Sequence, residues 1–180
     1  MNTFSIDQEV MEEMLTNEGS SLWDLTFKQP VLLVFLRHFG CTFCREALSD
    51  IAKIKPRIEA SGISVVFVHM TDNKIADRYF QRYQLAGAVH ISDPECEFYA
   101  KFGLVKGNFT QLFGLQSWIR GFQSGIIEGN GVGYKQVGDG FQMPGVFVLQ
   151  DGQVKDAFIH RLSHDRPDYE NLITNCCKIS

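Results

Sequence analysis

Hydrophobic residues in the first half of the chain alternate between two patterns, which predict buried strands and amphipathic helices in turn. Residues 31–36 read Val-Leu-Leu-Val-Phe-Leu, a short apolar run typical of a strand buried on both faces. From Thr42 to about residue 62, apolar residues recur at helical spacing, and residues 63–69 repeat the buried-strand pattern. This order predicts a βαβ unit whose two strands run parallel.

Shorter patterns extend this order toward both ends of the chain. Proline and aspartate mark two of the predicted helix starts, and an Asp-Gly dipeptide marks the predicted hairpin turn. The further predicted elements are helices over 6–16, 74–83, from Asp93-Pro94 and from Arg166-Pro167-Asp168, a strand over 88–91, and a hairpin of strands 146–149 and 154–159. Mixed strands and helices in this sequence predict an α/β fold.

A change in composition interrupts the alternation in the second half. Eleven of the 16 glycines lie between Gly103 and Gly145, together with many aromatic residues. Such a stretch predicts an elaborated loop region rather than regular elements. We therefore expect one domain over residues 1–180, with a Gly- and aromatic-rich insertion at about 104–141.

Composition and charge restrict the partners of the protein. The hydrophobic fraction is 44%, the charged fraction is 21%, and the net charge of -4 argues against nucleic-acid or anionic-membrane binding. The sequence has no apolar run of about 18 residues, and its acidic N-terminus is unlike a signal peptide. We therefore expect a cytoplasmic protein whose partners are neutral molecules or other proteins.

The strongest chemical signal is a pair of cysteines, Cys41 and Cys44, directly after the predicted central strand. Unpaired backbone N–H groups and the helix dipole stabilise an anion at the first turn of a helix, so a thiol there ionises readily. The spacing of three residues brings both sulfurs to one face, where they can form a disulfide. The sequence therefore predicts a two-step redox cycle.

The residues around the pair favour the same chemistry. Arg37, His38 and Arg45 add positive charge or hydrogen-bond donors, and Gly40 permits a sharp turn between strand and helix. Two alternatives are a zinc site and plain burial of the thiols. The remaining cysteines, Cys96, Cys176 and Cys177, would complete a zinc site poorly. The charged neighbours weigh against plain burial. We therefore expect no metal and no cofactor.

The segment Phe-Leu-Arg-His-Phe-Gly-Cys-Thr-Phe-Cys-Arg-Glu at 35–46 resembles the peroxiredoxin-like branch of the thioredoxin superfamily, which is related to alkyl hydroperoxide reductase and thiol-specific antioxidant (AhpC/TSA). Segments 151–155 and 165–169 support the resemblance. It implies a thioredoxin-like fold, a central mixed sheet flanked by helices, with the cysteines opening a helix that Pro56 kinks. It also implies a cis-proline facing the cysteines, at Met143-Pro144 before the strand 146–149.

The resemblance leaves the roles of the two cysteines open. Typical peroxiredoxins carry proline, then Thr or Ser, then the peroxidatic cysteine, whereas here Arg37 stands at the proline position and Cys41 at the Thr position. Cys44 then matches the peroxidatic cysteine. In thioredoxins the first cysteine of the pair attacks, which would make Cys41 the nucleophile and Cys44 the resolving thiol.

These observations lead to a functional hypothesis. We expect an antioxidant oxidoreductase that reduces peroxides or disulfides through Cys41 and Cys44, with Arg37 and Arg45 assisting and a thioredoxin- or glutathione-type dithiol as reductant. Residues expected to contact substrate are His38, Gly40, Thr42, Met143 and Pro144. The resemblance also suggests a homodimer. The alternative is a thioredoxin-fold module that senses redox state or binds a protein without catalysis.

Overall fold

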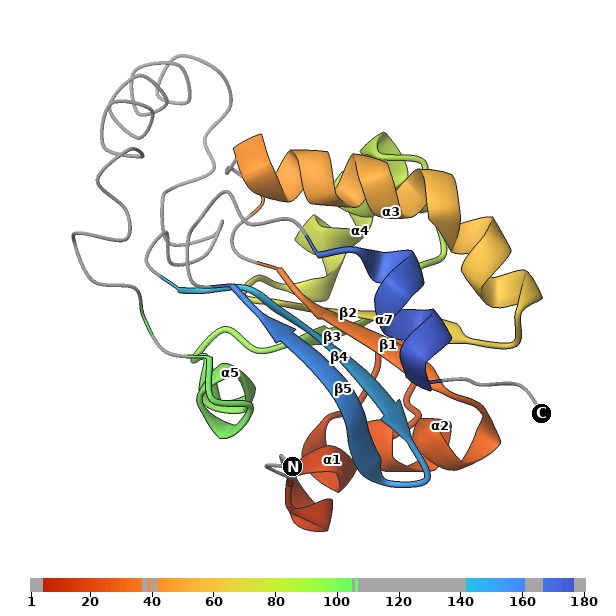
Figure 1. Ribbon diagram of the computed structural model, residues 1–180. Helices are drawn as coiled ribbons and strands as arrows, with labels where there is room; N and C mark the ends of the chain where they lie inside the picture. The colour runs from red at the N-terminus through yellow and green to blue at the C-terminus, as the bar shows by residue number, and fades with distance from the viewer. Residues whose placement is uncertain are drawn as a thin grey trace.

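The computed structural model describes residues 5–36, 39, 42–104, 106, 142–160 and 167–176, with all their side chains except those of 42–44, 170, 175 and 176. The strands form a central sheet, and helices lie on both of its faces (Figure 1). The elements are α1 (Gln8–Glu13), α2 (Leu22–Lys28), β1 (Val31–Phe35), α3 (Thr42–Ala60), β2 (Ser64–His69), α4 (Asn73–Arg82), β3 (Val89–Ser92), α5 (Glu97–Lys101), β4 (Gly145–Gln150), β5 (Gln153–Ile159) and α7 (Tyr169–Cys176).

The strands form one mixed sheet in the order β3-β2-β1-β4-β5. β1 and β2 run parallel, as do β2 and β3, while β4 is antiparallel to both β1 and β5. α3 connects the parallel strands β1 and β2, so the predicted βαβ unit is confirmed. At the end of β1, Phe35 lies opposite Gly145, the first residue of β4.

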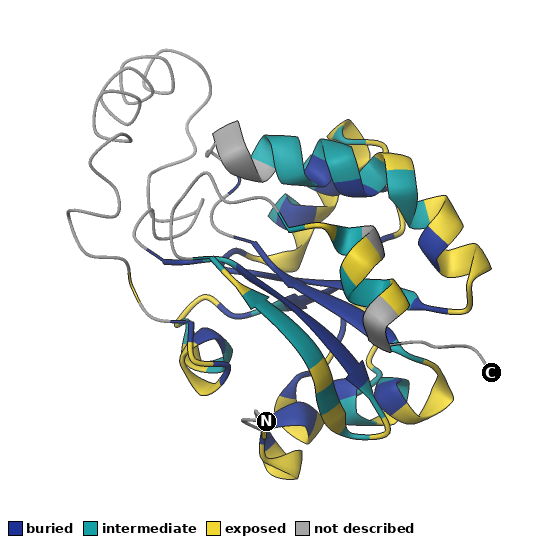
Figure 2. Ribbon diagram, viewed as in Figure 1, coloured by how far each residue is buried: buried dark blue, intermediate teal, exposed yellow. Residues whose placement is uncertain are grey.

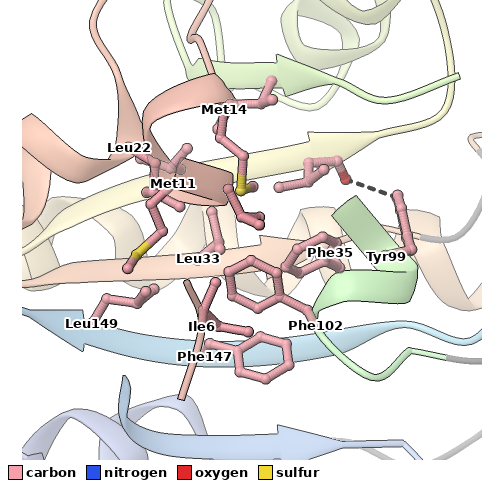
Figure 3. Close-up of a cluster of buried hydrophobic side chains, with 14 of the residues drawn as sticks. Ile6, Met11, Met14, Leu22, Leu33, Phe35, Tyr99, Phe102, Phe147 and Leu149 are labelled. Carbon is pink, nitrogen blue, oxygen red and sulfur yellow. Dashed lines mark hydrogen bonds between the residues drawn. The ribbon is translucent and has the colours of Figure 1, made fainter. Parts of the chain in front are cut away.

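Helices cover both faces of the sheet, with α1, α2 and α5 on one side and α3, α4 and α7 on the other (Figure 1). Successive side chains of a strand point to opposite faces, so β1 contributes to two cores. Val31, Leu33 and Phe35 belong to the first core, which Figure 3 shows, and Leu32 and Val34 to the second. All five residues of β1 are buried, as predicted for a strand covered on both faces (Figure 2).

The two edge strands of the sheet, β3 and β5, differ in how they are covered. The segment after α1 turns back beside β3, where Asn17 N donates to His90 O at 2.8 Å and His90 N donates to Asn17 Oδ1 at 3.0 Å. Asn17 Nδ2 also donates to Ala88 O at 3.3 Å. A single asparagine thus occupies part of the β3 edge. The other edge, β5, has mixed exposed and half-buried residues (Figure 2).

The predicted hairpin between β4 and β5 is confirmed. Asp151 and Gly152 both have positive φ, at 51° and 69°, as a two-residue hairpin turn requires. The turn docks on α2, because Asp151 N donates to Thr26 O at 2.9 Å and Gly152 N to Thr26 Oγ1 at 3.0 Å. This contact joins the C-terminal hairpin to an N-terminal helix.

Two helices differ from the sequence-based expectation. The first was predicted over 6–16 but ends at Glu13, because Met14 leaves the helical conformation and its carbonyl accepts from Leu22 N at 2.9 Å as the chain turns back. α2 was not predicted. Its start is stabilised by Ser21, whose side chain accepts from Asp24 N at 3.1 Å. The predicted insertion at 104–141 lies almost wholly outside the described residues.

Candidate functional site

The parallel strands β1, β2 and β3 end at the same edge of the sheet, and β4 begins there. β1 ends at Phe35 at this edge, and the next helix, α3, begins at Thr42. Cys44 lies in the first turn of α3, and Cys41 immediately precedes this helix in the sequence. The predicted helix start beside the cysteines is therefore confirmed, at Thr42.

Most of the predicted site residues fall in or near this junction. Arg37, His38, Gly40 and Cys41 lie outside the described residues, as do the side chains of Thr42 and Cys44. Arg45 is half-buried, and its Nε atom is shielded from solvent. Their predicted roles in catalysis and substrate binding therefore stay predictions.

Met143 and Pro144 lie directly before β4, opposite the end of β1. Met143 is buried and Pro144 half-buried. The peptide bonds of the described residues are all trans, so the expected cis bond at Pro144 is wrong. The trans form is intrinsically preferred for X-Pro bonds, and here hydrogen bonds hold the chain on both sides: Gln142 Nε2 donates to Leu104 O at 2.7 Å and His160 N to Pro144 O at 3.4 Å.

Tyr99 of α5 ties together the ends of β1 and β2. Its buried hydroxyl donates to the carbonyl oxygens of Leu36 and Val68, the second at 3.1 Å. Leu36 N also donates to Val68 O at 2.9 Å. Leu36, the residue after β1, is therefore held through both its N–H and its carbonyl group. Figure 3 shows Tyr99 beside Phe35 at the margin of the first core.

Asp93 positions the helix that carries Tyr99. Its carboxylate accepts from the backbone N–H groups of Glu97 at 2.9 Å, Phe98 at 2.9 Å and Tyr99 at 3.1 Å. Burial raises the pKa of the Asp93 carboxyl group above its ordinary value, and the three N–H donors partly oppose this effect. The predicted helix start at Asp93-Pro94 is confirmed in kind, although α5 itself begins at Glu97.

Phe39 anchors the segment between β1 and α3 in an aromatic box on the second core. Its ring stacks on Tyr79 with centroids 4.6 Å apart and an interplanar angle of 7°. It also contacts Phe80 edge-on at 5.6 Å and His69 at 5.8 Å. The box joins β2 to α4 and fixes a residue two positions before Cys41.

Two buried histidines extend from this box to the surface. His69 Nε2 lies 2.8 Å from His90 Nδ1, and His90 Nε2 lies 3.0 Å from Asp77 Oδ1. At the inner end, Thr71 N donates to His69 Nδ1 at 3.4 Å. Burial, followed by the nearby His90, lowers the pKa of His69 to about 3, so the ring is neutral at physiological pH.

Sequence reasoning did not single out His69, His90, Asp77 or Tyr99. The available signal was weak: a histidine ends one buried strand and another lies within the next. Asp93 was identified only as a helix start. Among the described residues, no three His, Cys, Asp or Glu side chains are grouped as a metal site would require, and no helix is long and apolar enough to cross a membrane.

Comparison with known proteins gives consistent matches. The family profile described as "AhpC/TSA antioxidant enzyme" matches residues 50–164, a segment that begins within α3 after Cys44. "Thioredoxin-like protein AAED1, chloroplastic" of Arabidopsis thaliana is 24% identical over 170 residues, covering 86% of this chain and 64% of the relative. "Peroxiredoxin-like 2A" of Bos taurus is 27% identical over 164 residues, covering 87% and 68%. The chain thus spans about two thirds of these relatives' length.

Solved structures support the fold. A cysteine-to-serine mutant of Xylella fastidiosa PrxQ superposes with a TM-score of 0.64 and 13% sequence identity, covering 97% of this chain and 94% of that one. The predicted thioredoxin-like fold, a mixed sheet flanked by helices, is therefore confirmed.

Proposed function

Because this chain belongs to the AhpC/TSA antioxidant enzyme family, we propose that it is a thiol-dependent oxidoreductase that reduces peroxides through Cys41 and Cys44. Family membership over residues 50–164 carries the proposal. The start of α3 at Thr42 supports it, because a helix N-terminus stabilises the thiolate that such chemistry requires.

The proposed reaction has three balanced steps. A thiolate attacks the peroxide, the O–O bond breaks, and the sulfur becomes a sulfenic acid while the alkoxide takes a proton and leaves as an alcohol. The second thiol attacks that sulfur, forming the Cys41–Cys44 disulfide and releasing water. A cellular dithiol of the thioredoxin or glutathione type then reduces the disulfide by thiol exchange and is itself oxidised.

Neighbouring residues have proposed supporting roles. Arg37 and Arg45 would stabilise the thiolate or polarise the bound peroxide, because a guanidinium group favours nearby negative charge. His38, Gly40 and Thr42 would form the wall of the substrate site next to the sulfurs. Met143 and Pro144 lie across from the end of β1, where their backbone could contact a substrate over the same edge of the sheet.

Serine substitutions test the cysteine assignment. We expect Cys41→Ser with Cys44→Ser to abolish peroxide consumption driven by a dithiol, and one single variant to abolish attack while the other leaves a trapped sulfenic acid. Cys96→Ser is the matched control and should keep the activity. Full turnover by the double variant would contradict the proposal, and oxidation of the pair without turnover would identify a redox sensor instead.

A further inference from the structure

A hydrogen-bond chain runs from Thr71 through His69 and His90 to Asp77. Only one placement of the ring protons gives each of these contacts a donor and an acceptor. Thr71 N–H can only donate, so Nδ1 of His69 is its acceptor and the His69 proton sits on Nε2. That proton is donated to Nδ1 of His90, so the His90 proton sits on Nε2. It is donated to the Asp77 carboxylate. The hydrogen bonds therefore run in one direction, from the core to the surface.

An additional proton does not fit this chain. A proton on Nδ1 of His90 would face the N–H of His69, and one on Nδ1 of His69 would face the N–H of Thr71. The titratable groups facing His69 are His90 from β3 and the more distant Asp72, which caps α4, and His90 in turn faces Asp77 of α4. Both rings are almost fully buried, at 1% exposed for His69 and 0% for His90. The hydrogen bonds thus fix the orientation of both rings.

His69, near the inner end of this hydrogen-bond chain, contacts Phe39, which precedes the cysteines in the sequence. Phe39 is 2% exposed, and its ring is enclosed by His69, Tyr79 and Phe80. Buried rings in close packing cannot rotate without displacing their neighbours. The orientation of His69 therefore limits where Phe39 can lie, and Phe39 is two residues from Cys41.

We propose that His69 is a positioning residue for the cysteine pair, held by the chain that ends on Asp77 and acting through Phe39. This inference rests on the proposed function of Cys41 and Cys44. The carboxylate of Asp77, whose side chain is 62% exposed, thereby supports from the surface the orientation of a buried ring.

Nuclear magnetic resonance tests the chain in the unaltered protein. Long-range ¹H–¹⁵N correlation at pH 7 should show His69 as a neutral ring protonated on Nε2. A ring of His69 protonated on Nδ1, or on both nitrogens, would overturn the proposal. This measurement requires no variant and no turnover.

Substitution of Asp77 tests the link to the cysteines. Asp77→Leu removes the acceptor, Asp77→Asn keeps an acceptor oxygen, and Asp24→Leu makes the same change at an exposed helical aspartate near the opposite end of β1. The readout is the rate at which iodoacetamide alkylates Cys41 and Cys44 at pH 7, followed by peptide mass spectrometry. We expect Asp77→Leu to slow alkylation about tenfold, because the thiols are misplaced. The rates for Asp77→Asn and Asp24→Leu should stay within about twofold of the wild-type rate.

Two results would overturn the positioning role. One is an alkylation rate for Asp77→Leu within about twofold of wild type. The other is equal slowing in Asp77→Leu and Asp77→Asn, which would implicate the charge rather than the hydrogen bond. Alkylation reports on the thiols without peroxide, so these results are distinct from a failure of the proposed reaction, which the cysteine-to-serine variants detect.

Discussion

His69 links the stability of the protein to pH through a buried neutral ring. Its pKa is lowered from 6.5 to about 3, chiefly by burial. In the unfolded chain the same ring takes up a proton below about pH 6.5, whereas the folded protein does not until about pH 3. The unfolded state then binds more protons, so the contribution of His69 to stability is present above pH 6.5 and is lost as the pH falls.

We therefore expect the free energy of unfolding to fall between pH 6.5 and 3 by up to about 1.4 kcal/mol for each pH unit from this group. Urea unfolding at several pH values measures it. His69→Gln can accept from Thr71 and donate to His90 but does not titrate, so its pH dependence should be flatter. Parallel curves for the two proteins would contradict the assignment.

Tyr99 contributes through one hydroxyl group at the ends of β1 and β2. Tyr99→Phe leaves the carbonyl oxygen of Leu36 without this donor in a buried position, so we expect a loss of about 1–3 kcal/mol in urea unfolding. Tyr83→Phe, at the half-buried tyrosine that follows α4, is the matched control and should change stability by less than about 0.5 kcal/mol. Equal effects would show that the hydroxyl of Tyr99 is unimportant.

At the scale of elements, the turn between β4 and β5 depends on a missing side chain. A Cβ atom at Gly152 would lie 2.5 Å from Trp23 of α2, and the residue also has a φ of +69°. Gly19 shares the positive φ, at +84°, but has no atom within 4 Å of such a Cβ. The two glycines therefore separate backbone strain from a steric clash.

We expect Gly152→Ala to destabilise the protein by about 1–3 kcal/mol more than Gly19→Ala, because only the first forces Trp23 away from the turn. Thermal and urea unfolding measure the difference. A change in Trp23 fluorescence should accompany the first substitution. Equal losses at both positions would mean that the turn accommodates the methyl group without moving α2.

Elements with a strong local signal were predicted from the sequence, and those set by distant contacts were not. The continuous apolar runs of β1 and β2 and the Asp-Gly turn carry their structure locally. α2 lacks such a pattern, and the end of α1 depends on Met14 meeting Leu22. The expected cis bond at Pro144 came from the resemblance alone, and the structure has a trans bond there.

At the scale of the whole molecule, β1 couples the two cores, and its neighbours β2 and β4 likewise contribute residues to both. Leu33 belongs to the first core and Leu32 to the second, and both are 0% exposed. A strand that lies in both cores transmits the loss of packing on one face to the other, because its hydrogen bonds to β2 and β4 serve both. The cores should therefore unfold together.

We expect Leu32→Ala and Leu33→Ala each to cost about 2–5 kcal/mol and each to preserve a single cooperative transition. Leu15→Ala, at a leucine that is 57% exposed, should change stability by less than about 0.5 kcal/mol. Urea unfolding followed by circular dichroism and by hydrogen exchange of α3 and α5 tests this. Separate transitions for the two helices would contradict the coupling.

The candidate site was only partly predictable, because some of its parts are local in the sequence and others depend on tertiary contacts. The strand-to-helix junction is local in the sequence, and the start of α3 at Thr42 agrees with it. The box around Phe39 and the His69–His90 pair instead join β2, α4 and β3, which are brought together only by the tertiary fold. Periodicity and motif spacing contain no record of such contacts.

The position of Asn17 along β3 has a consequence for assembly. Its main chain and side chain occupy the hydrogen-bonding groups of Ala88 and His90 that an incoming strand would need. This protection obstructs pairing of β3 with a strand of a second molecule, because a covered edge offers few free backbone groups. Any continuous sheet shared between two copies would have to be built outward from β5.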